Sequence, residues 1–433
     1  MKKNKDNVTI IGAGLAGCEA AWQLAKRGFG VTLYEQKPVK FSPAHHEPTF
    51  AEIVCSNSLK SIDLSTASGL LKAEMEILDS LIIKVAKECA VPAGGALAVD
   101  RVKFSQKIDK ILRAMPNITV VNCEATGFNL EKTIIATGPL TSGELYSNLT
   151  EFLGEENLHF YDASAPIIEA DSIDYQKTFS KSRYSEADGD YINCPLTKEE
   201  YYAFVNELVS AKRVELHSFE KNEIFEGCMP IEVMASRGID SLRFGPLKPV
   251  GLTDENGERP YAVVQLRKEN AAGSLYNLVG FQTNLTFGEQ KRVFSLIPAL
   301  KNAEFVKLGV MHRNSFVNAP KYLEKDFSVK GYPTLYIAGQ LSGVEGYVES
   351  AMSGLIAGLS LASKLENKPI LELSNKTMIG AITNYLTSPN TNFQPMNANF
   401  GIMESIEDKI KDKKERKLKL SERALNEFKD KKF

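Results

Sequence analysis

The sequence predicts an α/β fold in which a Rossmann-type domain is interrupted by an inserted α+β domain. The chain opens with an apolar run, a Gly-x-Gly-x-x-Gly turn, an amphipathic segment and a second apolar run, over residues 7–35. A strand, a glycine-rich turn and a small-residue helix follow near the other end, over residues 335–358. The region between them lacks this rhythm, so the chain is expected to leave the first domain and return to it.

Each position of the N-terminal pattern has a mechanical reason. The run Val8–Ile11 is typical of a buried strand, and the segment Cys18–Arg27 has helical spacing and ends at Gly28. In the turn between them, the first glycine permits a tight bend, the second lets the backbone approach a pyrophosphate, and the third allows close helix–strand packing. Unpaired N–H groups at the start of the helix attract phosphates. The residues expected to contact a dinucleotide here are Gly12, Ala13, Gly14, Leu15, Ala16 and Gly17.

Glu35 ends the second strand, Val31–Tyr34, where a carboxylate suits the hydroxyls of an adenosine ribose and opposes a 2′-phosphate. This acid fits FAD or NAD. Two later segments favour FAD. Lys132–Pro139 is a strand that runs into a glycine turn, and Leu335–Gly358 resembles the C-terminal flavin motif of the glutathione-reductase-like group, where a helix N-terminus faces the flavin ring. The glycines expected to approach the flavin are Gly138, Gly339, Gly343 and Gly346.

The predicted fold class is therefore a glutathione-reductase-like, FAD-binding Rossmann domain with an inserted α+β domain. Between about residues 190 and 325, short apolar or alternating runs predict the strands of a separate sheet. We expect a discontinuous FAD-binding domain from residues 1–189 and 326–433, with residues 190–325 as the insertion.

Composition limits the class of protein. The 433 residues are 43% hydrophobic and 24% charged, as in ordinary globular proteins, and no run approaches the ~20 apolar residues of a membrane span. The basic N-terminus has too short an apolar run for a signal peptide, so we expect a cytoplasmic protein. The 6 cysteines form no Cys-x-x-Cys pair, and His45 and His46 have no third ligand at convincing spacing. Neither a metal site nor a disulfide framework is expected.

The net charge of −2 gives no global indication of a polyanionic partner, but the C-terminal segment is basic. Residues 408–433 contain 11 Lys or Arg against 6 Asp or Glu. Two interpretations remain open: a solvated, charged terminal helix, or a basic arm that contacts phosphates.

Two cysteines stand in unusual surroundings. Cys228 lies between a glycine and Met229-Pro230 in "FEGCMPIE", and Cys55 lies in the polar segment "VCSNS". Each residue is either a buried structural cysteine or a nucleophile held on a turn. A thiol in a reducing compartment remains available as a nucleophile once its pKa falls.

Several blocks together resemble one known family. They include "GAGLAGCEAAWQLAKRG", "AEIVCSNSLKS", "VPAGGALAVDR", "FEGCMPIEVMASRG" and "GQLSGVEGYVESAMSGL", in this order along the chain. The sequence is similar to the folate- and FAD-dependent uracil-5-methyltransferases, which form ribothymidine in the T-loop of bacterial tRNA. The likeness extends over the whole chain except for residues 420–433. A more distant relative, the FAD protein that modifies wobble uridines, has a helical C-terminal extension that this chain lacks.

The resemblance implies cofactors and roles for the two cysteines. NADPH or NADH reduces FAD, methylenetetrahydrofolate supplies the carbon, and reduced flavin supplies the hydride that completes the methyl group. Cys228 would add to C6 of the uracil and make C5 nucleophilic. Cys55 would lie near the flavin and help to form or release the adduct.

The resemblance also implies an RNA partner. A uridine of tRNA is the usual substrate of the family, and a uridine of large-subunit (23S) rRNA is the second possibility. A third alternative is a FAD oxidoreductase of a small molecule, which would need no thiol at Cys228. No membrane partner and no obligate protein partner are expected.

Overall fold

The computed structural model describes most of the chain. The described residues are 6–141, 143–154, 158–163, 165–183, 188–214, 229–254, 257–270, 272–309, 311–390, 393–407 and 410–429. Within these ranges, no helix is both long and apolar enough to cross a membrane.

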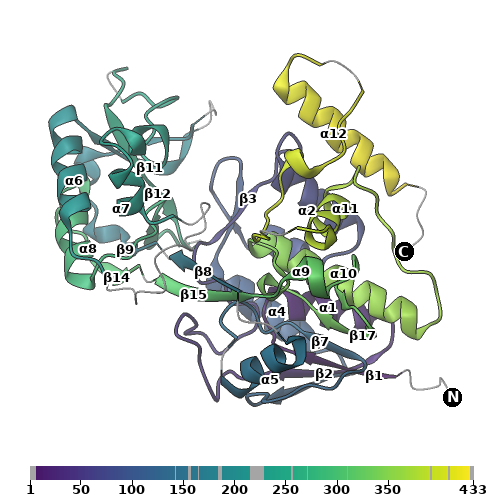
Figure 1. Cartoon of the computed structure of the whole chain (residues 1–433). Coiled ribbons are helices and arrows are strands. Elements are labelled where there is room, and N and C mark those ends of the chain that lie inside the picture. Colours follow the sequence, from purple (N-terminus) through teal and green to yellow (C-terminus); the bar gives the residue numbers. More distant parts are fainter. Residues whose placement is uncertain are drawn as a thin grey trace.

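The first structural unit is built on a six-stranded sheet (Figure 1). Its strands are parallel except for β16, which pairs antiparallel with β17 at one edge. Strands β1 and β2 run side by side, as expected for a strand–turn–helix–strand unit. In sheet order the strands are β16 (Ser328–Val329), β17 (Tyr332–Ile337), β7 (Thr133–Ile135), β1 (Asn7–Ile11), β2 (Gly30–Glu35) and β6 (Ile118–Asn122).

Two helices from opposite ends of the sequence pack closely in this unit: α1 (Leu15–Lys26) and α10 (Tyr347–Leu365). Most of α10 is buried, and its small residues let the two backbones approach each other. A Cβ atom on Gly354 would collide with the backbone of Ala16. The close approach of α10 to α1 therefore brings the C-terminal motif beside the N-terminal turn.

The remaining elements of the first unit surround this framework. A small sheet consists of β3 (Ser58–Ser61), β5 (Ala96–Val99) and β4 (Ala90–Val91). The helices are α2 (Ala67–Ile77), α3 (Leu81–Glu88), α4 (Arg101–Arg113), α5 (Gly143–Leu153), α9 (Ala319–Tyr322), α11 (Met378–Thr387) and α12 (Lys413–Glu427). Two short 3-10 turns are η6 (Gln340–Ser342) and η7 (Phe400–Ile402).

A buried carboxylate joins two of these helices. Glu74 on α2 accepts the N–H groups of Met378 (2.7 Å) and Ile379 (2.8 Å) at the start of α11. These bonds satisfy helix donors that have no partner within their own helix. Burial raises the pKa of Glu74 to about 8, and the two bonds from α11 offset only part of this effect.

The C-terminal helix α12 has two different halves. Leu420, Ala424 and Phe428 are buried, and Ser421 Oγ donates a hydrogen bond to Leu64 O at 2.6 Å. The first turn and a half is exposed and rich in lysine. The helix is thus anchored to the first unit by its second half, and its basic first half faces solvent.

The second structural unit contains a separate antiparallel sheet, which lies to one side of the first unit (Figure 1). Its strands are, in order, β10 (Phe179–Lys181), β11 (Asp188–Leu196), β12 (Ala262–Lys268), β13 (Leu275–Leu278), β9 (Ile167–Glu169) and β14 (Phe305–Lys307). The helices are α6 (Lys198–Ser210), α7 (Ile231–Ser236) and α8 (Phe287–Phe294), with 3-10 turns η1 (Ala170–Ser172), η2 (Tyr175–Lys177), η4 (Ser241–Phe244) and η5 (Pro298–Leu300). This unit has a hydrophobic core of its own.

A two-stranded ribbon links the units, formed by β8 (Leu158–Ala163) and β15 (Met311–Phe316). In Figure 1 both strands lie between the two sheets. The expected start of the insertion, residue 190, falls inside β11, and β9 and β10 of the same sheet precede it. We therefore propose that the inserted unit begins near residue 165, directly after β8.

Candidate functional site

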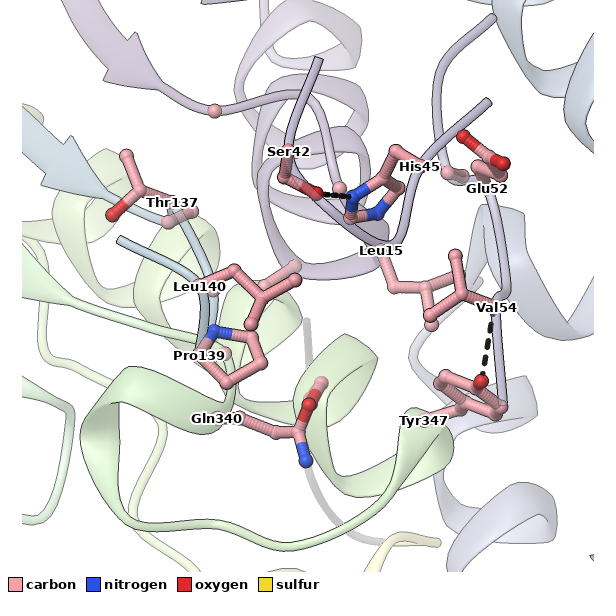
Figure 2. Close-up of a pocket in the computed structure, with 18 of the residues that line it drawn as sticks. Leu15, Ser42, His45, Glu52, Val54, Thr137, Pro139, Leu140, Gln340 and Tyr347 are labelled. Carbon is pink, nitrogen blue, oxygen red and sulfur yellow. Dashed lines mark hydrogen bonds between the residues drawn. The ribbon is translucent and has the colours of Figure 1, made fainter. Parts of the chain in front are cut away.

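One cavity of about 410 Å³ runs between the N-terminal turn and the start of α10. Figure 2 shows side chains from several distant segments around it, among them Leu15, Pro139 and Tyr347. Most of the glycines expected from the sequence line it. The expected site residues in its wall are Gly12, Ala13, Gly14, Leu15, Ala16, Glu35, Cys55, Gly138, Gly339 and Gly346.

Two expected site residues lie outside the cavity wall. Gly17 is not part of the wall, and a Cβ atom there would collide with the carbonyl of Gly12. Gly343 has a φ of +87°, and its Cβ would lie 2.6 Å from the ring of Phe393. Both glycines therefore serve close packing around the cavity. Cys228 lies outside the described residues.

The turn between β1 and α1 forms one part of the cavity wall. Gly12 has a φ of +99°, which favours glycine, and a Cβ atom there would come within 2.5 Å of Ala136 O. At Gly14, which precedes α1, nothing lies within 4 Å of a Cβ position. The N–H groups of the first turn of α1 have no partners within the helix. This end of the cavity is therefore suited to an anionic group.

Glu35 is fixed at the end of β2 by two backbone donors. Its Oε2 accepts the N–H of Ala13 and its Oε1 accepts the N–H of Lys37, both at 2.9 Å. The residue is only 7% exposed. Each carboxylate oxygen has a further acceptor site, so the oriented group can also accept a hydrogen bond from a hydroxyl. Cys123 and Glu124, at the end of β6, line the same part of the cavity.

The turn that carries Cys55 lies near the start of α10. The hydroxyl oxygen of Tyr347 accepts the N–H groups of Val54 (3.1 Å), Cys55 (2.7 Å) and Ser56 (3.4 Å). Figure 2 shows the bond between Tyr347 and Val54. Consecutive N–H groups that point at one oxygen form a concave donor site. Tyr347, the first residue of α10, therefore holds the Cys55 turn against the start of this helix.

Cations hold the carbonyl side of the same turn. Arg101 Nη1, at the start of α4, donates to Ile53 O (3.0 Å) and Val54 O (2.9 Å). Lys307 Nζ, from β14 of the second unit, donates to Val54 O at 3.2 Å. Burial lowers the pKa of Lys307, and the nearby Arg101 lowers it further. The two cations therefore hold the carbonyl groups that precede Cys55 in place.

The second unit also contacts the next residues along the turn. Arg267 on β12 donates from Nε to Asn57 Oδ1 (2.9 Å) and from Nη2 to Ser56 Oγ (2.7 Å). Asn57 Nδ2 in turn donates to Lys268 O at 2.9 Å. Burial lowers the pKa of Arg267. The Cys55 turn is thus at the junction of the two units, and both units supply hydrogen bonds to it.

Other cysteines are less suited to react. Cys18 and Cys194 are fully buried, and burial raises the pKa of each thiol. Cys89 is also buried and its pKa is raised for the same reason. Among the described cysteines, only Cys55 and Cys123 line the cavity.

The adjacent residues His45 and His46 each make a hydrogen bond with a neighbouring polar side chain. Ser42 Oγ and His45 Nδ1 are 2.6 Å apart, as Figure 2 shows. The backbone N–H of His46 donates to Glu52 Oε1 at 2.9 Å, and Lys37 pairs with Glu52 at 3.3 Å. Among the described residues, no group of three or more His, Cys, Asp or Glu side chains could hold a metal ion.

Sequence reasoning did not identify Tyr347, Arg101 or Lys307 as parts of the site. Tyr347 directly follows an expected cofactor glycine, which was the one available indication of its place. Arg101 ends the block "VPAGGALAVDR", but nothing in that block indicates which turn it contacts, and Lys307 follows no recognisable motif. Their contacts with the Cys55 turn join residues 47 and 253 positions apart.

The parallel sheet, the glycine turn and the return of α10 to α1 define an FAD-binding, Rossmann-type fold. The solved structure of GidA from Aquifex aeolicus supports this fold, with a TM-score of 0.66 at 17% identity over 88% of this chain and 69% of that one. Residues 7–369 match the family model "Glucose inhibited division protein A".

Closer relatives identify the family. The chain is 56% identical, over 98% of both chains, to the methylenetetrahydrofolate--tRNA-(uracil-5-)-methyltransferase TrmFO of Acetivibrio thermocellus. It is 54% identical to the TrmFO of Bacillus subtilis, again over 98% of both chains. The chain belongs to the TrmFO family, as its sequence blocks predicted.

Proposed function

We propose that this chain is a methylenetetrahydrofolate-dependent methyltransferase that forms 5-methyluridine in the T-loop of tRNA, with FAD as cofactor and NADPH or NADH as reductant. The observation that carries the proposal is identity of 56% to a TrmFO relative over 98% of both chains. The second unit and the link between the units lie within this match, so the likeness extends well beyond a shared flavin fold.

The cavity residues fit FAD. The open position at Gly14 leaves room for a pyrophosphate against the first turn of α1. Glu35, held by two backbone donors, is placed to accept a ribose hydroxyl. Gly339 and Gly346 line the cavity beside the start of α10, at the end where Cys55 lies. Bound FAD would supply the redox chemistry that completes the methyl group.

Cys55 is the described thiol at the reacting end of the cavity. Tyr347 binds its turn through three N–H groups, and Arg101 and Lys307 bind the carbonyls of that turn. These contacts restrict the orientation of the turn that carries the thiol. We assign Cys55 a role in forming or releasing the carbon adduct.

Cys228 is proposed as the nucleophile that adds to C6 of the uridine, a step that makes C5 nucleophilic. The segment that follows it is anchored close to the cavity. Ile231 N–H donates to Gln282 O at 2.7 Å, and Gln282 lines the cavity. Glu232, fully buried, accepts hydrogen bonds from Thr283 Oγ1 (2.9 Å) and Asn284 N–H (2.8 Å). These bonds hold the start of α7, which follows Cys228 in the sequence, beside the cavity residue Gln282.

The proposal is tested with purified protein, methylenetetrahydrofolate labelled in the methylene carbon, and separate tRNA and 23S rRNA transcripts. NADPH and NADH are compared as reductants. We expect labelled 5-methyluridine in tRNA. Label in the rRNA transcript alone would move the substrate to rRNA, and flavin reduction without label in either RNA would favour a small-molecule oxidoreductase.

The role of Cys228 is tested with tRNA that carries 5-fluorouridine at the target position. Such a base cannot lose its C5 substituent as a proton, so the adduct with the nucleophile persists. Cys228→Ala should retain FAD yet form no covalent RNA adduct, whereas the control Cys89→Ala should form it normally. A covalent adduct in Cys228→Ala would assign the nucleophile to another residue.

A further inference from the structure

The second unit exposes an aromatic side chain close to the segment that follows Cys228. Phe244, at the end of η4, is 83% exposed, the highest value among the large hydrophobic side chains of the described residues. Ile239 is 47% exposed and lies on the same short segment. Exposed apolar groups gathered in one place indicate a binding surface more often than isolated ones. We define the Phe244 surface as Arg237, Ile239, Arg243, Phe244 and Lys248.

The segment that carries Phe244 is rigidly held. Leu242 is fully buried in the core of the second unit. The guanidinium of Arg243 lies 3.6 Å from the ring centroid of Tyr261, and its Nε donates to Tyr261 O at 2.9 Å. Tyr261 Oη donates to Asp240 Oδ1 at 3.0 Å, which ties the loop to the residue before β12. An aromatic group on a fixed backbone segment costs less ordering entropy on binding than one on a mobile loop.

The Phe244 surface is linked to the cavity wall through helix α7. Helix α7, which begins three residues after Cys228, is anchored to the cavity residue Gln282 through Ile231 N–H. Its 6 residues span about 9 Å at 1.5 Å each. The loop with Phe244 begins at the far end of this helix and packs against it. This length corresponds to about two or three stacked nucleotides at 3.4 Å each.

We propose that the Phe244 surface binds RNA, with the Phe244 ring stacked on an unpaired base that neighbours the target uridine. This inference rests on the proposed function, because it names how the RNA substrate is held. Three cations, Arg237, Arg243 and Lys248, lie on the same segment of the chain as Phe244, and Asp240, which pairs with Arg243 at 3.6 Å, is the one carboxylate between residues 237 and 248. Arginine and lysine complement phosphates, and aromatic rings stack on unpaired bases.

The chemistry of the surface favours RNA over a protein partner. A stable protein–protein interface needs about 800 Å² on each side and a well-packed apolar centre. Here the exposed apolar side chains are few, namely Phe244, Ile239 and the less exposed Val250, and they alternate along the chain with charged residues. A base needs only one flat apolar face and nearby cations, and this surface provides both.

The test uses the FAD-loaded protein and a fluorescent hairpin with the T-arm sequence of tRNA. Phe244→Ala should raise the Kd about 5- to 150-fold, the effect of losing one stacked base. The slope of log Kd against log salt should stay unchanged in this variant, because no phosphate contact is lost. Phe244→Trp should restore the affinity, since indole also stacks. Phe287→Ala is the matched control, because Phe287 is 56% exposed on α8 of the same unit.

The cations are tested separately. Arg237→Gln combined with Lys248→Gln should reduce the salt slope by about 2, close to one for each phosphate contact. An unchanged Kd in Phe244→Ala, or an equal loss in Phe287→Ala, would overturn the proposal. A change in self-association of Phe244→Ala, without a change in RNA affinity, would assign the surface to a second copy of the chain instead.

Failure of this inference is distinguishable from failure of the proposed function. If the wild-type protein methylates tRNA while Phe244→Ala binds and methylates it equally well, only the role of the Phe244 surface is refuted. If the wild-type protein neither binds nor methylates tRNA, the proposed function itself is refuted.

Discussion

Removing the Tyr347 hydroxyl is expected to loosen the Cys55 turn. In Tyr347→Phe, the N–H groups of Val54, Cys55 and Ser56 lose a common acceptor that now lies at 3.1, 2.7 and 3.4 Å. A lost hydrogen bond costs about 1 kcal/mol net, and the longest of the three contributes least. Local opening of the turn should therefore become easier by about 2 to 3 kcal/mol. This corresponds to a roughly 30- to 150-fold rise in the open population.

Hydrogen exchange measured by mass spectrometry on the FAD-loaded protein checks this estimate. The amides of residues 54–56 should exchange faster by that factor, whereas amides in the second unit should not change. Tyr385→Phe is the matched control, because the Tyr385 hydroxyl donates to Gln394 O at 3.1 Å, on a different loop from the Cys55 turn. Unchanged exchange at residues 54–56 in Tyr347→Phe would refute the claim that Tyr347 holds this turn.

Three further predictions follow from other parts of the first unit. Glu35→Gln should weaken FAD binding about 10- to 100-fold, as judged by flavin fluorescence, because a charged acceptor for the ribose is lost; equal affinity would remove Glu35 from the nucleotide site. Burial raises the pKa of Glu74 to about 8, whereas in the unfolded state this group loses its proton above about pH 4.5. Between these two pH values the folded state binds one proton more than the unfolded state. The contribution of Glu74 to stability therefore falls as the pH rises toward 8. Compared with Glu74→Gln in denaturant titrations, the wild-type protein should therefore be relatively more stable at pH 5 than at pH 8, and a difference independent of pH would contradict the raised pKa. Replacing Lys413, Lys414 and Lys417 by glutamine should reduce the slope of log Kd against log salt for tRNA binding by up to about 3. An unaltered slope would support the interpretation of α12 as a solvated helix.

Local patterns predicted the parts of the site that depend on short stretches of chain. The turn at Gly12 and Gly14 and the acid at Glu35 follow from steric and hydrogen-bonding needs within one strand–helix–strand unit. The structure places all three residues in the wall of one cavity. Such needs act over a few residues, so one sequence suffices to read them.

The contacts around Cys55 could not be predicted in this way. Tyr347 and Cys55 are 292 positions apart, and the bond between them depends on how α10 returns to α1. The start of the second unit was also hard to locate, since β9 and β10 have only 3 residues each. Strands of that length carry too little periodicity to be distinguished from loops.

The central claim is that FAD in this cavity is required for carbon transfer from the folate to tRNA. The most direct test strips the flavin from the purified protein and measures labelled 5-methyluridine formed from methylenetetrahydrofolate before and after FAD is added back. We expect no product from the stripped protein and restored product after FAD addition, in proportion to the flavin bound. Equal product formation without FAD would contradict it.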